Sequence, residues 1–146
     1  MTLELLVNID VDDLDRALAF YTSALPLRVG RRFGDGGVEL LGASSALYLL
    51  AKPAGSEGAP GSPRGYARHW TPLHLDFAVP DLDAAVARAT EAGATVEQPA
   101  VARSWGSIAM LADPFGHVWS VGTHVEDVSS EEMRRREAKF HGGGQG

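Results

Sequence analysis

The chain has 146 residues, enough for one ordinary domain or for two small units that share a core. Its hydrophobic fraction of 45% is typical of a globular protein with a packed interior, and its net charge of −6 disfavours nucleic acid, whose phosphates it would repel. Because the sequence contains no cysteine, disulfides, thiolate nucleophiles and cysteine-bound zinc are excluded.

Neither a secretion signal nor a membrane segment is expected. The N-terminus, MTLELLVNID, lacks a basic region and carries acidic residues early, unlike a signal peptide. The longest apolar run, residues 40–51, is too short to span a bilayer. We therefore expect a cytoplasmic protein that has no nucleic-acid partner and no membrane partner.

The first predicted element is a strand over residues 3–11, because apolar and polar side chains alternate along it. Asp13 then stands at the position of a helix N-cap, whose side chain accepts free backbone N–H groups. Apolar residues recur at helical spacing after it, which predicts an amphipathic helix. Strands are expected at about 27–33, 37–41 and 46–51, so the first half is predicted to be β-α-β-β-β.

Residues 52–71 are rich in glycine, proline and serine, a composition that predicts a loop between two halves. The last part of this link, RGYARHW (64–70), carries two aromatic rings and three cationic or titratable side chains. It is either a linker whose tip packs loosely or a lid that closes over a ligand.

The second half repeats the first at a constant shift of 68 residues. VPDLDAAVARATEA (79–92) is identical to VDDLDRALAFYTSA (11–24) at eight of fourteen positions, and an alternating strand over 73–79 precedes it. Asp81 is the predicted N-cap of the second helix, and Gly93 is its predicted stop. Further strands are expected at about 95–98, 106–112 and 117–123.

The C-terminal segment EDVSSEEMRRREAKF (126–140) predicts a short helix, with Ser129 and Glu132 forming a capping box. The final HGGGQG is expected to be a disordered tail. The predicted organisation is a first unit over 1–51, a linker over 52–71, a second unit over 72–124, and the helix and tail over 125–146.

Paired βαβββ units joined by such a link resemble the vicinal oxygen chelate (VOC) superfamily. That superfamily includes glyoxalase I, extradiol dioxygenases, fosfomycin-resistance enzymes and bleomycin resistance proteins. The likeness is carried by DLDRALAFYTSAL (13–25), LHLDFAVPDLDAA (73–85) and W-G-x₆-D-P-F-G-H-x-W (105–119). It covers one VOC domain over 1–124, and the following extension resembles glyoxalase-like or PhnB-like members.

The resemblance implies an α+β fold in which two βαβββ repeats form a partial barrel around one cavity, followed by a short C-terminal helix. It also implies a homodimer. In this arrangement the helices cover one face of each sheet, and the other face lines the cavity. Trp119, Phe20 and Tyr21 are then expected in the core, and His117 is expected to be structural and to face away from the cavity.

The resemblance also implies where a metal would bind, with one ligand from the first strand and one from the last strand of each half. Leucine cannot ligate a metal, and a neutral serine is a poor ligand for a divalent ion. We therefore expect no metal at the usual site. The aligned positions hold Leu6, His74, Ser120 and Leu49, or Tyr48 or Leu50 if the register is shifted by one.

A displaced site is the alternative, in which His74 and Asp76 hold a divalent metal together with Asn8 or Asp10. Without a metal, apolar walls and a few polar groups still suit a small molecule, and flat rings stack on flat ligands. The aspartates and the negative net charge favour a cationic guest. Candidate ligand-binding residues are Asn8, Asp10, Tyr48, Trp70, His74, Asp76, Trp105 and Ser120.

Two classes of function compete. The first, implied by the bleomycin-binding branch, is a metal-free protein that sequesters an aromatic or cationic antibiotic and so confers resistance. The second is an enzyme: a metal-dependent lyase, isomerase or dioxygenase with a displaced site, or a metal-free catalyst with His74 as general base and Asp76 orienting it. An ordinary metabolite as ligand is a third possibility. We favour binding.

Overall fold

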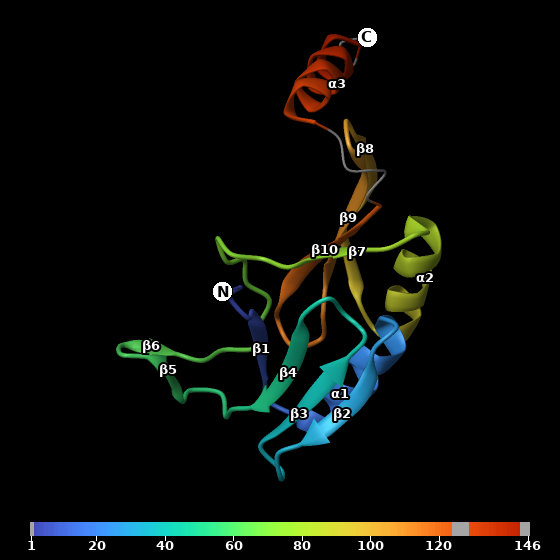
Figure 1. The fold of residues 1–146 in the computed structure, drawn as a ribbon. Coiled ribbons are helices and arrows are strands. Elements are labelled where there is room, and N and C mark those ends of the chain that lie inside the picture. The colour runs from blue at the N-terminus through green and yellow to red at the C-terminus, as the bar shows by residue number, and fades with distance from the viewer. Residues whose placement is uncertain (1, 124–128, 144–146) are drawn as a thin grey trace.

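The structure, a computed structural model, describes residues 2–123 and 129–143, with side chains up to residue 140. It is the predicted α+β fold, with two four-stranded sheets, each belonging to one βαβββ unit, and no closed barrel (Figure 1). None of the helices in these ranges is long and apolar enough to cross a membrane.

The first unit contains one sheet in the strand order β1-β4-β3-β2, in which β1 is parallel to β4 and the other pairs are antiparallel. The first strand starts at Leu6 instead of residue 3, and Leu3 and Leu5 before it are exposed. The elements are β1 (Leu6–Val11), α1 (Leu14–Ala24), β2 (Arg28–Arg32), β3 (Gly37–Leu41) and β4 (Ala46–Ala51).

The second unit repeats this topology in the order β7-β10-β9-β8. Its first strand is shorter than predicted, because only three residues pair with β10. β8 is longer than predicted, because its pairing with β9 continues to Arg103 through two register shifts that break the alternation. The elements are β7 (Asp76–Ala78), α2 (Leu82–Ala92), β8 (Thr95–Arg103), β9 (Gly106–Ala112) and β10 (Val118–Gly122).

Two further segments differ from the prediction. The link, predicted as loop, contains a small hairpin of β5 (Glu57–Ala59) and β6 (Ser62–Pro63) that projects from the body (Figure 1). The last helix, α3 (Ser130–Gly143), runs into the predicted tail and stands away from the sheets (Figure 1). Ser129 Oγ accepts the Glu132 N–H at 3.2 Å, but residues 124–128 and 144–146 lie outside the described residues.

Both predicted N-caps of the repeated helices are confirmed. Asp13 Oδ1 accepts the backbone N–H of Arg16 at 3.1 Å, and Asp81 Oδ1 accepts that of Ala84 at the same distance. Each carboxylate satisfies a backbone donor that the first turn of a helix leaves free. The repeated V-x-D-L-D block therefore starts each helix at the same point of its unit.

The hydrophobic core lies between the helices and one face of each sheet, as the alternation predicted. In β1 and β4, Ile9, Val11 and Leu49 are buried, and in β10 Trp119 and Val121 are buried. Phe20 and Tyr21 of α1 complete this core, so the predicted positions of both rings and of Trp119 are confirmed.

A buried polar network joins the two units. The Tyr21 hydroxyl of α1 donates to Asp113 Oδ2 at 2.5 Å and accepts the Trp119 indole N–H at 3.2 Å. Asp113 Oδ1 accepts the backbone N–H groups of Phe115 and His117, both at 2.8 Å. Burial, with the nearby Asp113 charge, raises the pKa of Tyr21 well above its usual range, so the phenol keeps its proton.

The two helices add a second junction between the units. The Arg88 guanidinium of α2 donates to Ser23 O at 2.7 Å and to Leu25 O at 3.2 Å, at the end of α1. Those carbonyls are among the acceptors that a helix C-terminus leaves without intrahelical partners. The units of one chain therefore associate through α1 and α2, while β1 and β7 stay at the edges of their own sheets.

Replacing the Tyr21 hydroxyl tests the buried network. In Tyr21→Phe the ring still fills the core, but Trp119 loses its acceptor and Asp113 Oδ2 loses its donor. We expect the free energy of unfolding in urea to fall by about 1–3 kcal/mol. The matched control is Tyr48→Phe, whose hydroxyl is only part-buried, and a Tyr21→Phe protein no less stable than this control would contradict the expectation.

Candidate functional site

On the first sheet, polar and aromatic side chains of β2, β3 and β4 contact one another. Glu39 accepts hydrogen bonds from Arg31 Nη2 at 2.9 Å and from the Tyr48 hydroxyl at 3.3 Å. The hydrogen bonds from Arg31 lower the pKa of Glu39 to about 2. The Tyr48 ring also stands 5.9 Å from that of Phe33, so this predicted ligand-binding residue is held away from the cavities described below.

The second sheet borders three hollows. The largest, the seam cavity, has a volume of about 460 Å³ and lies between β1 and the segment leading into β7. It is bordered by Asn8 and Asp10 of β1, by Ile9, Leu75 and Trp119, and by three histidines: His69, His74 and His117. His117 thus lines a cavity, although alternation predicted that it would face away.

The other two hollows lie on the concave face of the second sheet. The larger cup, about 190 Å³, is lined by Trp70, His74, Gln98, Arg103, Trp105 and Ser120, among others. The smaller cup, about 170 Å³, is lined by Asp76, Ala78, Trp105, Ile108 and Thr123, among others.

The three hollows adjoin one another. The seam cavity and the larger cup share His74, Val118 and Trp119, and the two cups share Trp105 and Ile108. The three hollows are together called the trough, which borders the second sheet from the seam to the β8–β9 hairpin tip. Of the predicted ligand-binding residues, the trough brings together Asn8, Asp10, Trp70, His74, Asp76, Trp105 and Ser120, and leaves out Tyr48.

Trp105 stands at the tip of the β8–β9 hairpin, which is fixed against the end of β10. Gly106 has φ +154°, and a Cβ there would lie 2.1 Å from the Thr123 carbonyl oxygen. Ser107 N donates to Thr123 Oγ1 at 3.0 Å, and Thr123 N donates to Ser107 O at 2.9 Å. The tip can approach β10 this closely only with glycine at 106, so Trp105 is held in place as a wall between the cups.

Two polar residues of the larger cup were missed by sequence reasoning. Gln98 and Arg103 lie on β8 outside the repeated motifs, and the register shifts along this strand hide which face each side chain occupies. Only an aligned β8–β9 hairpin, with Arg103 opposite Gly106, would have placed them beside Trp105.

The positions of the usual metal ligands do not supply a donor set. Leu49 is fully buried in the core, so the aligned register was off by one, and Tyr48 and Leu50 occupy the concave face. Ser120 pairs in register with Asp76, but a neutral hydroxyl is a poor ligand. Among residues 2–123 and 129–140, no group of three histidine, aspartate or glutamate side chains is arranged to hold a metal.

His74 and Asp76 form a pair on the trough. His74 Nδ1 lies 3.3 Å from Asp76 Oδ1, and the two side chains are 47% and 59% exposed. An exposed pair of this kind contributes little to stability, because water screens it. It does orient the imidazole through one ring nitrogen, as a general base requires.

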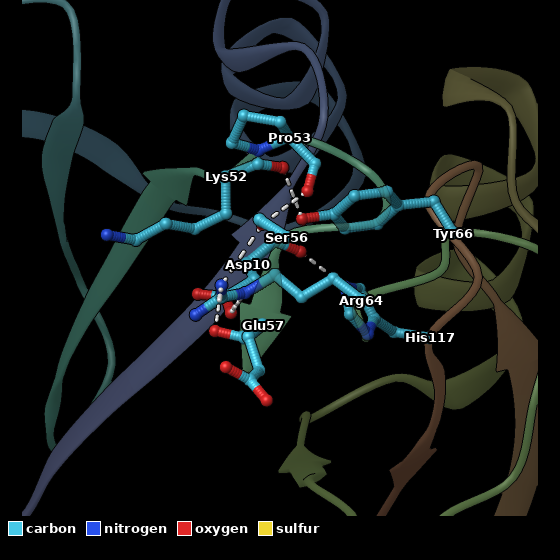
Figure 2. A network of polar contacts seen from close by, with 8 residues as sticks. All are labelled: Asp10, Lys52, Pro53, Ser56, Glu57, Arg64, Tyr66 and His117. Atoms are coloured by element: carbon cyan, nitrogen blue, oxygen red, sulfur yellow. Dashed lines mark hydrogen bonds and ion pairs between the residues drawn. The ribbon is translucent and has the colours of Figure 1, made fainter. Parts of the chain in front are cut away.

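Asp10, expected to attract a cationic guest, already has a partner within the chain (Figure 2). Arg64 Nε lies 2.8 Å from Asp10 Oδ2, and the same guanidinium donates to Glu57 O at 2.9 Å and to Ser56 Oγ at 3.2 Å. His117 Nε2 lies 2.7 Å from the Asp10 carbonyl oxygen. The carboxylate is therefore largely neutralised where it borders the seam cavity.

The end of the link is bound to the body at further points. The Tyr66 hydroxyl donates to Lys52 O at 2.6 Å, and His69 N donates to Gly116 O at 3.1 Å. Gly116 has φ +92°, and a Cβ there would lie 2.6 Å from the Ala67 carbonyl oxygen. The link thus packs on the turn before β10, and Trp70 beyond it reaches the larger cup while staying 61% exposed.

Two βαβββ units around an open trough define a member of the vicinal oxygen chelate superfamily. The fosfomycin resistance protein FosX of Listeria monocytogenes shares this fold with a TM-score of 0.66, at 17% identity over 92% of this chain and 96% of that one. The antibiotic binding protein TnmS3 of Streptomyces sp. CB03234 has a TM-score of 0.63, at 25% identity over 86% and 98% of the two chains.

The sequence profile of the glyoxalase-like domain matches residues 6–122, and the chain belongs to that family. The uncharacterized protein Mb0911c of Mycobacterium bovis is 42% identical over 65 residues, which is 44% of this chain and 43% of that protein. The chain spans less than half the length of the curated relatives it matches.

Loss of the Arg64 side-chain contacts is expected to loosen the link. In Arg64→Gln, Asp10 loses its charged partner and the β5–β6 hairpin loses its contact with β1. We expect amide hydrogen exchange across residues 55–69 to become about tenfold faster or more, with the sheets unchanged. The control is Arg68→Gln in the same link, whose more exposed pair with Glu97 should matter less, and equal exchange in both variants would contradict this.

Proposed function

We propose that this protein binds a small aromatic molecule in the trough, without a metal at the family's usual site. The observation that carries the proposal is the position of Trp105, which is fixed at the hairpin tip and faces both cups. Trp70 borders the larger cup as a second indole. A planar ligand stacked on such a ring gains about 0.5–1.5 kcal/mol beyond the apolar area it buries.

The composition of the trough supports a binding site for a small molecule. Its walls are mainly apolar, with Ile108, Met110 and Val118 in the larger cup, and a few polar groups interrupt them. Ligand sites in proteins have this character. The seam cavity, about 460 Å³, lies within their usual range of about 300–1,000 Å³, and the cups beside Trp105, about 190 and 170 Å³, are smaller. The similarity to TnmS3, an antibiotic binding protein, favours sequestration of an antibiotic as the biological role.

The absence of a bound metal is part of the proposal. Leucine at position 6 and serine at 120 leave His74 as the one strong ligand among the four aligned positions. A single imidazole does not compensate a divalent ion for its lost hydration. The similar FosX structure contains Mn(II), whereas the residues of this chain favour a site without a metal.

A catalytic role is the second candidate, and the His74–Asp76 pair favours it. An imidazole oriented by a carboxylate can abstract a proton next to a carbonyl group. In the metal-free form of this proposal, His74 is the base and Asp76 orients it. A displaced metal site that includes His74 is the other enzymatic form.

Assembly as a homodimer stays a prediction. Leu3, Leu5 and Leu73 are 91%, 67% and 86% exposed beside the seam, and a second copy would cover such apolar area. Location in the cytoplasm and a role in resistance also stay predictions.

Replacement of Trp105 tests the binding site. We expect anthraquinone-2-carboxamide, a flat neutral probe, to quench the tryptophan fluorescence of the protein and to bind about tenfold more weakly to Trp105→Ala. Affinity for the variant is measured by calorimetry, because the variant lacks one fluorophore. The control is Phe33→Ala, an exposed ring of the first sheet, which should leave the affinity unchanged. An equal loss in both variants, or no binding to the parent protein, contradicts the proposal.

Metal analysis and proton exchange separate binding from catalysis. After dialysis against nickel, zinc, manganese or ferrous iron, we expect less than about a tenth of a metal ion per chain. We also expect no exchange of the α-protons of hydroxyacetone in D₂O above the buffer rate. Near-stoichiometric metal, or rapid exchange, that disappears in His74→Ala would instead establish the corresponding enzymatic form.

A further inference from the structure

We propose that the trough selects an aromatic ligand bearing an anionic group, with Arg103 as the residue that determines this preference. The inference deepens the proposed function, on which it rests, and it reverses the expectation of a cationic guest. Arg103 borders the larger cup at the hairpin tip, two residues from Trp105.

The acidic residues near the trough do not line the larger cup. Asp10 is paired with Arg64, and the two side chains are only 33% and 21% exposed, so its charge is compensated inside the protein. Asp76 borders the smaller cup and lies 3.3 Å from His74, whose imidazole partly compensates it when protonated. Neither carboxylate lines the larger cup.

Several hydrogen-bond donors line the larger cup. Arg103 carries five N–H donors and a permanent charge, and Gln98, Ser120 and His74 each carry a side-chain group that can donate. Within the described residues, the Arg103 guanidinium has no ion-pair or hydrogen-bond partner of its own. A carboxylate, phenolate or sulfonate would find a donor on each of these side chains, whereas an ammonium group would find no carboxylate among the residues that line this cup.

The net charge of −6 would repel an anion at long range. At physiological ionic strength this repulsion decays over about 8 Å, so within the cup the nearest charge dominates. Among the residues that line the cup, Arg103 carries the one permanent charge. With Asp76 at the smaller cup and Arg103 at the larger one, the charges also orient the guest: its ring lies against the indole, and its anionic group points toward Arg103.

Three probes with one ring system test the inference: anthraquinone-2-carboxylate, anthraquinone-2-carboxamide and 2-(aminomethyl)anthraquinone. We expect the carboxylate to bind about 3- to 10-fold more tightly than the carboxamide, and the ammonium probe to bind most weakly. In Arg103→Gln the carboxylate should lose its advantage over the carboxamide, so that the ratio of the two affinities falls to about one. Arg103→Lys should keep part of the preference, and added salt should reduce it.

The matched control is Arg32→Gln, which removes an exposed arginine of β2 outside the trough and should keep the order of affinities. Binding of all three probes with equal affinity, tightest binding of the ammonium probe, or a preference that survives in Arg103→Gln overturns the inference and leaves the proposed function standing. Failure of all three probes to bind overturns both.

Discussion

The hydrogen bonds of the buried Tyr21 hydroxyl connect the two halves of the molecule, and the geometry of the trough depends on them. A buried phenol, carboxylate and indole N–H must find partners within the protein, and here each partner belongs to the opposite unit or to the turn before β10. Because Asp113 also accepts two backbone N–H groups of that turn, the turn has one orientation. That orientation brings His117 to Asp10 and brings Gly116 against the link.

Much of the fold could be predicted from the sequence, because its signals are local. The N-caps at Asp13 and Asp81 and the two-residue alternation depend on neighbouring residues, and they predicted both βαβββ units. The β5–β6 hairpin was missed, since its strands of three and two residues are too short for alternation to show. The length of β8 was also missed, because its register shifts interrupt the alternation of apolar and polar residues that identifies a strand.

The sequence predicted the tryptophans that line the trough better than it predicted which charged side chains there are paired. Alternation along β7 and β10 indicates which side chains share the concave face, and this was enough to group Asp76 with Ser120. It does not indicate which charges are compensated, because the partner of Asp10 lies 54 residues away in a segment predicted as loop. Nor does it predict a cation from β8, whose faces depend on pairing with β9. An aspartate counted from sequence suggested a cationic guest, whereas the partners of the charges in the folded chain lead to the proposal of an anionic one.

The division of each strand into two faces has an evolutionary consequence. Along β10, Trp119 and Val121 pack toward the helices while Ser120 faces the trough. Core packing therefore restricts Trp119 and Val121, and contact with a ligand restricts Ser120. Mutations at the trough positions can accumulate with little effect on the helix-side packing that gives the fold its stability. In such a scaffold, single substitutions can change the bound ligand or remove a metal site, and each variant along the way still folds stably. Among related chains, ligand specificity is then expected to diverge earlier than the fold.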